Sequence, residues 1–102
     1  MNDQVKSRID GMLNDNKVFL FMKGTPAFPQ CGFSARAVAI LREMGVSFGS
    51  FNVLEDTEVR EGIKEYGQWP TIPQLYVNKQ LVGGSDIMME MYQEGELQKV
   101  LA

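Results

Sequence analysis

The stretch "KVFLFMKGTPAFPQCGFSARAVAILREMG", residues 17–45, decides the fold. Its first six residues form a continuous apolar run of strand length, which is typical of a central buried strand. Glycine and prolines then break the run, and from Ser34 to Met44 the apolar residues recur at helical spacing. Gly45 is suited to end that helix. The stretch predicts a strand, a loop and a helix, with the only cysteine of the chain, Cys31, in the loop.

Segments on both sides extend this unit. Residues 47–53 alternate in polarity and predict a second strand, while 74–77 and 80–82 predict a hairpin. Apolar residues at helical spacing predict helices over 2–16, 57–66, 86–94 and 96–102. A strand–helix–strand unit favours a right-handed crossover with parallel strands, and the hairpin extends the sheet in antiparallel fashion. We therefore expect a thioredoxin-like α/β fold, with a four-stranded mixed sheet flanked by helices.

The composition indicates one globular domain over residues 1–102. Apolar residues make up 44% of the chain, no apolar run approaches the roughly 18 residues of a membrane span, and residues 1–10 lack the apolar stretch of a secretory signal. The net charge of −3, without a basic stripe, argues against nucleic acid as the main partner. A single cysteine forms no internal disulfide, so we expect a reducing intracellular compartment, with the cytoplasm favoured over an organelle.

The surroundings of Cys31 suggest a reactive thiol. A lone cysteine is most often a small buried hydrophobe, but Cys31 lies in a Pro- and Gly-containing loop directly before a helix, and Lys23 ends the preceding strand. A helix N-terminus and a nearby lysine lower a thiol pKa from about 8.5 to roughly 3.5–7.5. Cys31 is therefore a candidate thiolate at neutral pH.

The chain offers this thiol few partners. It has no histidine, which excludes Cys-His catalysis and mixed Cys/His zinc sites, and Ser34 stands where a dithiol motif would place its second cysteine. A lone thiolate that attacks a disulfide needs an external thiol for release. A [2Fe–2S] cluster usually needs four thiolates, so cluster binding here requires two chains and two small thiols.

Three motifs carry a resemblance to a known family. "KGTPAFPQCGFS" (23–34), "WPTIPQLYV" (69–77) and "GGSD" (83–86) resemble, in order and spacing, the signatures of the monothiol, or CGFS-type, glutaredoxins. The resemblance implies that Cys31 ligates a [2Fe–2S] cluster shared by two subunits, with two glutathione molecules as the remaining ligands. It also implies a cluster-dependent homodimer with a monomeric apo form, delivery of clusters to iron–sulfur acceptor proteins, and a part in iron homeostasis.

The resemblance further implies a glutathione site. Lys23 and Arg60 match the cations for the glycine carboxylate. The backbone of Ile72, before a cis proline, matches the segment that pairs with the glutathione cysteine, and the N–H groups of Ser85 and Asp86 match the site of the γ-glutamyl carboxylate. Each also has an ordinary structural explanation: solvated charges, a strand boundary and a helix cap. Ser85 departs from the many relatives that carry cysteine there, which leaves Cys31 dependent on external thiols.

Two further functions stay open. The same residues suit a glutathione-dependent thiol–disulfide oxidoreductase acting through Cys31, for which the resemblance implies at most weak activity. We rank this second because the proline-containing loop before Cys31 is expected to alter the approach of the glutathione sulfur. A redox-inert adaptor with a buried Cys31 ranks third.

Overall fold

The first strand organises the molecule, because both of its faces are covered. In the computed structural model, which describes residues 1–102, β1 (Val18–Met22) is buried along its whole length. Successive side chains of a strand point to opposite faces. Val18, Leu20 and Met22 accordingly belong to one apolar cluster, and Phe19 and Phe21 belong to another. The central buried strand predicted from the sequence is confirmed.

A four-stranded mixed sheet forms around β1 in the order β2-β1-β3-β4. β2 (Gly49–Asn52) runs parallel to β1, while β3 (Gln74–Val77) pairs antiparallel with β1 and with β4 (Gln80–Gly83). The hairpin turn places Asn78 and Lys79 at φ 51° and 68°. Two left-handed residues in succession match the twist of the flanking strands. The predicted topology, including the hairpin, is confirmed.

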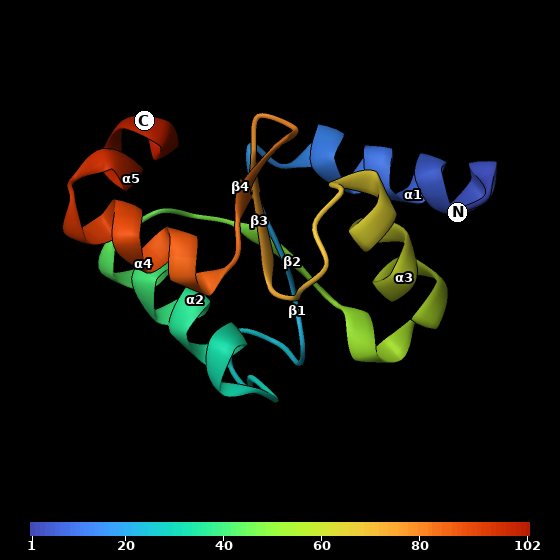
Figure 1. Cartoon of the computed structure of the whole chain (residues 1–102), viewed down its shortest axis with the longest axis horizontal. Coiled ribbons are helices and arrows are strands. Elements are labelled where there is room, and N and C mark those ends of the chain that lie inside the picture. The colour runs from blue at the N-terminus through green and yellow to red at the C-terminus, as the bar shows by residue number, and fades with distance from the viewer.

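Helices cover both faces of the sheet, with α2, α4 and α5 on one side and α1 and α3 on the other (Figure 1). Their bounds are α1 Asp3–Asp15, α2 Gly32–Glu43, the short 3₁₀ helix η1 Val53–Glu55, α3 Thr57–Tyr66, α4 Ser85–Gln93 and α5 Glu96–Leu101. The thioredoxin-like α/β fold is thus confirmed. None of the helices combines the length and hydropathy needed to cross a membrane.

Two boundaries differ from the predicted ones. α2 begins at Gly32 instead of Ser34, because Cys31 caps the helix with its own side chain. The strand predicted over 47–53 is shorter, because Asn52 accepts a hydrogen bond from the Leu54 N–H and so starts a 3₁₀ turn. Gly45 follows the C-cap of α2 at φ +69°, as expected for a glycine that ends a helix.

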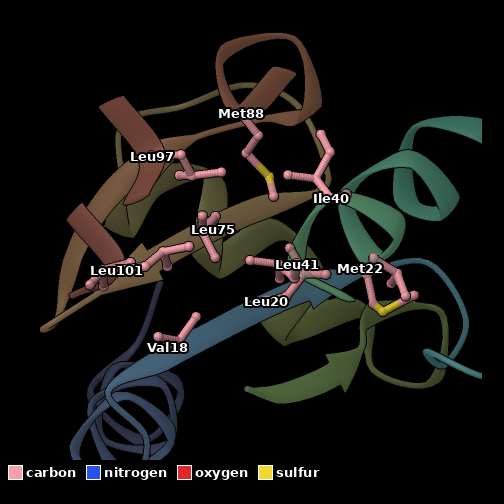
Figure 2. Packing of buried hydrophobic residues seen from close by; sticks show 12 residues of the cluster. Val18, Leu20, Met22, Ile40, Leu41, Leu75, Met88, Leu97 and Leu101 are labelled. Carbon is pink, nitrogen blue, oxygen red and sulfur yellow. The ribbon is translucent and has the colours of Figure 1, made fainter. Parts of the chain in front are cut away.

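The larger core cluster packs one face of the sheet against α2, α4 and α5 (Figure 2). Met88 of α4 is fully buried there, with Met89 and Met91 packed at its margin, so the methionines of α4 fill the core. The second cluster joins the other face to α1 and α3. Both faces of the sheet are therefore packed against helices.

One edge of the sheet gathers the loops that matter for function. β1 ends and β3 begins at this edge, because Phe21 pairs with Gln74 in antiparallel register. α2 and α4 also begin at this edge (Figure 1). Residues from four distant parts of the sequence are therefore brought together.

Candidate functional site

The Cys31 thiol sits at the N-terminus of α2, where it acts as the helix cap. Its Sγ accepts a hydrogen bond from the Ser34 backbone N–H at 3.4 Å and lies 3.4 Å from the Ser34 hydroxyl. Ser34 is fully buried, and its Oγ also accepts the Lys23 N–H at 3.0 Å. Since that oxygen is occupied as an acceptor, its own proton is free to point at the sulfur.

These contacts favour the ionised thiol. Partial burial, the largest single influence, raises the pKa of Cys31. The Ser34 hydroxyl, the N–H groups of Ser34 and Phe33, and the charge of Lys23 outweigh it, so the pKa is lowered overall. Cys31 remains partly accessible. The redox-inert adaptor requires a buried, unreactive thiol, and the Cys31 thiol is neither.

The loop between β1 and Cys31 is held in one conformation. Gly24 adopts φ +90°, and a Cβ there would lie 2.5 Å from the Phe28 carbonyl oxygen. Thr25 and Phe28 exchange backbone hydrogen bonds at 3.3 and 3.0 Å. Asn52 at the end of β2 accepts the Gly24 N–H at 2.9 Å. The thiol is thus presented by a fixed loop, although the loop carries two prolines and no regular structure.

A cleft of about 400 Å³ lies beside the thiol. Its walls come from the end of β1, α2, α3, the segment before β3 and the start of α4. The lining residues are Lys23, Phe33, Arg60, Lys64, Trp69, Pro70, Thr71, Ile72, Pro73, Gly84, Ser85, Asp86 and Ile87. All five residues predicted to bind glutathione are among them. Cys31 does not line the cleft itself, but it is close to two lining residues, because the charge of Lys23 and the backbone N–H of Phe33 both lower its pKa. The fold therefore brings every predicted site residue to one place; their roles remain predictions.

One end of the cleft is positively charged. Lys23 and Arg60 have no acidic partner within 4.0 Å, whereas Lys64 pairs with Glu61 at 3.2 Å. The Arg60 Nε is buried and makes no hydrogen bond. A buried N–H without an acceptor is unfavourable. This end of the cleft is therefore suited to a carboxylate.

The opposite end offers backbone donors. The N-cap of α4 is Gly84, which has no side chain to accept a hydrogen bond from the first-turn N–H groups, and these groups have no acceptor within the helix. The Asp86 carboxylate points elsewhere and pairs with Arg36 at 3.3 Å. A negatively charged group is favoured at such an open helix N-terminus.

An extended segment joins these two ends. The Ile72–Pro73 peptide bond is cis, as the resemblance implied. The Ile72 N–H and C=O form no hydrogen bond within the chain. Trp69 is half-buried and contributes to the wall, with its indole N–H buried and unpaired. The segment can therefore offer one backbone donor and one acceptor to a peptide lying in the cleft.

Sequence reasoning missed three residues of the site. Lys64 follows Arg60 by four residues, so its place on the same helical face was available from spacing. Asn52 and Gln74 carried no such signal. Gln74 is fully buried at the start of β3 and donates hydrogen bonds to the carbonyls of Trp69 and Thr71 at 3.0 and 3.3 Å.

Comparison with known proteins identifies similar chains. A family model described as glutaredoxin matches residues 18–82. The chain is 58% identical to an uncharacterized monothiol glutaredoxin ycf64-like protein of Synechocystis sp., over 99% of this chain and 94% of that protein. It is also similar to the solution structure of reduced poplar apo GrxS14, with 49% identity, a TM-score of 0.84, and coverage of 93% and 87% of the two chains.

A more distant chain shares the fold. The crystal structure of a buckwheat glutaredoxin–glutathione complex superposes with a TM-score of 0.82 at 19% identity, covering 99% of this chain and 93% of that one. At this identity the likeness concerns the fold alone.

Proposed function

This chain belongs to the monothiol glutaredoxin family, and on that basis we propose that it binds glutathione and a subunit-bridging [2Fe–2S] cluster that it passes to acceptor proteins. The observation that carries the proposal is a single thiol of lowered pKa beside a cleft with free cations at one end and an open helix N-terminus at the other. Glutathione has a carboxylate near each end and a peptide between them, which matches this arrangement.

The binding roles follow from chemistry. Lys23 and Arg60 would pair with the glycine carboxylate, and Arg60 can add a hydrogen bond from its buried Nε. The Ile72 backbone would pair with the cysteine of glutathione as an added strand. The N–H groups of Ser85 and Asp86 would receive the γ-glutamyl carboxylate. The Asp86 carboxylate would exchange its partner Arg36 for the ligand ammonium.

The thiol count sets the stoichiometry of the cluster form. The chain has one cysteine and no group of three or more His, Cys, Asp or Glu side chains able to hold a metal ion. One subunit therefore fits a cluster only as the donor of one thiolate, and a second subunit and two glutathione thiols complete the set. The cluster would supply the soft metal centre that joins the subunits. The protein's part is to hold each thiolate ionised and each glutathione in place.

Anaerobic reconstitution tests this proposal. Wild-type protein supplied with iron, sulfide and glutathione should develop the visible charge-transfer bands of a cluster and sediment as a dimer. Cys31→Ser, or omission of glutathione, should abolish both. Bands that persist without glutathione, or in the variant, would contradict the proposal. A persistent dimer of apo protein would contradict a dimer held together by the cofactors.

Thiol–disulfide exchange is the second candidate, favoured by the accessibility and lowered pKa of Cys31. The Cys31 thiolate would attack the glutathione sulfur of a mixed disulfide and release the other thiol. A second glutathione thiolate would then attack the enzyme-bound disulfide, leaving glutathione disulfide and free Cys31. Fast turnover of a glutathione mixed disulfide, combined with failed cluster assembly, would place this function first.

A further inference from the structure

Resting on the proposed glutathione site, we infer that Gln74 is a positioning residue that preforms the ligand-binding segment Trp69–Pro73. Gln74 is fully buried at the start of β3 and does not line the cleft. Its side chain acts on the site through the backbone.

Both polar atoms of the Gln74 side-chain amide form hydrogen bonds. The Nε2 donates to the Trp69 carbonyl at 3.0 Å and to the Thr71 carbonyl at 3.3 Å. The Oε1 accepts the Tyr76 hydroxyl at 3.0 Å. A primary amide has two N–H donors and one strong acceptor. Gln74 is thus the only side chain that ties the backbone of this segment to the sheet.

The two donated bonds decide what the segment presents to the cleft. They engage the carbonyls of Trp69 and Thr71, whereas the N–H and C=O of Ile72 between them and the sheet remain free. Those free groups are the ones proposed to pair with the peptide of glutathione. A segment without the Gln74 bonds would have to be ordered by the ligand itself, which lowers affinity.

The same segment also supports the other end of the site. A Cβ built on Gly84 would lie 3.3 Å from the Pro73 carbonyl oxygen and 3.5 Å from the Trp69 Nε1. Gly84 is the N-cap of α4. The conformation set by Gln74 therefore bears on both the extended segment and the helix N-terminus, which together would hold most of the ligand.

Glutathione affinity separates this role from a merely structural one. Gln74→Met removes both donors at similar volume, and we expect it to weaken glutathione binding by at least ten-fold in calorimetry. Tyr76→Phe is the matched control: it removes one hydrogen bond of the same network but leaves both bonds to the segment, so affinity should change by less than three-fold. Both variants are compared at a temperature where circular dichroism shows them folded. Equal affinities for Gln74→Met and wild type would overturn the inference.

A second measurement needs no variant. In ligand-free wild-type protein, the ¹⁵N order parameters of Thr71 and Ile72 should match the roughly 0.85 of rigid backbone. Values below about 0.6 would mean that the segment is not preformed and would overturn the inference even if Gln74→Met did not fold. If wild type bound no glutathione, the proposed function would fail, while the order parameters of wild type and Gln74→Met would still decide whether Gln74 holds the segment in place.

Discussion

The N-termini of α2 and α3 have the same kind of cap but differ in what the cap contributes to the protein. In each, a side chain accepts a hydrogen bond from the backbone N–H three residues later: Cys31 Sγ from Ser34 at 3.4 Å, and Asp56 Oδ1 from Val59 at 3.1 Å. The pKa is lowered in both groups. Asp56 also pairs with Arg8 at 2.7 Å and does not line the cleft.

The difference shows how one physical effect supports two purposes. A helix N-terminus stabilises an anion wherever it occurs. At α3 that anion is a carboxylate already paired with a cation, so the effect contributes to stability. At α2 it is a polarizable thiolate left partly accessible beside a cleft, so the effect contributes to reactivity. Four substitutions test this distinction, from the largest expected effect to the smallest.

Cys31→Ser should remove function and leave stability nearly intact. The substitution eliminates the thiol, so alkylation and cluster bands should vanish. Serine is itself a preferred helix cap, so the free energy of unfolding should stay within about 0.5 kcal/mol of wild type. Urea titration checks the second expectation. A large loss of stability would mean that the sulfur supports the fold in a way that a hydroxyl cannot.

Ser34→Ala should lower both the stability of the fold and the reactivity of the Cys31 thiol. The Lys23 N–H loses its acceptor, which should lower the free energy of unfolding by about 1–3 kcal/mol. The thiolate loses the Ser34 hydroxyl as a donor, so the pKa of Cys31 should rise and alkylation at neutral pH should slow. The pH dependence of the alkylation rate measures this. Ser7→Ala, at an exposed position of α1, is the control and should change neither quantity.

A side-chain oxygen at the N-cap of α4 should compete with the ligand for the open N–H groups. At Gly84, a serine would offer an oxygen to the open N–H groups of α4 and compete with a carboxylate. Gly84→Ser should therefore bind glutathione about ten-fold more weakly than Gly84→Ala, in which the same Cβ approaches the Pro73 carbonyl at 3.3 Å. Calorimetry on both variants isolates the competing oxygen. Equal affinities would argue against a carboxylate at this terminus.

Asp56→Ala should reduce stability slightly and leave Cys31 unchanged. Because the pKa of Asp56 is lowered by its hydrogen bonds to Arg8 and Val59, its contribution is complete well above the ordinary value of 3.8 and disappears as pH falls through the lowered value. Wild type and variant should therefore differ in urea midpoint at pH 7 and converge in acid. Arg8→Met, which retains the cap, should show a smaller decrease. A change in the alkylation rate would show that the two helix termini are coupled.

Local features of the site were open to prediction. Cys31 beside a helix start and Lys23 at a strand end follow from residues close together in the sequence. The cis proline in "WPTIPQLYV" was implied only by the resemblance of that motif to the family. Arg60 and Lys64 share a helical face, and that too is a local property. The pairing of Asp86 with Arg36 is not local, since the two residues lie 50 positions apart, on α4 and α2.

The sequence by itself determined the order of elements and the buried strand β1, because apolar periodicity and helix signals act over a few residues. It also determined that one thiol must work without a partner cysteine. Only the tertiary structure determined which residues line the cleft. It also left the buried Arg60 Nε without a hydrogen-bond partner and directed the Gln74 side chain to the Trp69 carbonyl. A buried amide in a short strand has the same local signature as any other glutamine. Its meaning depends on which carbonyls the fold brings within hydrogen-bond distance, and that is settled by packing between segments far apart in the chain.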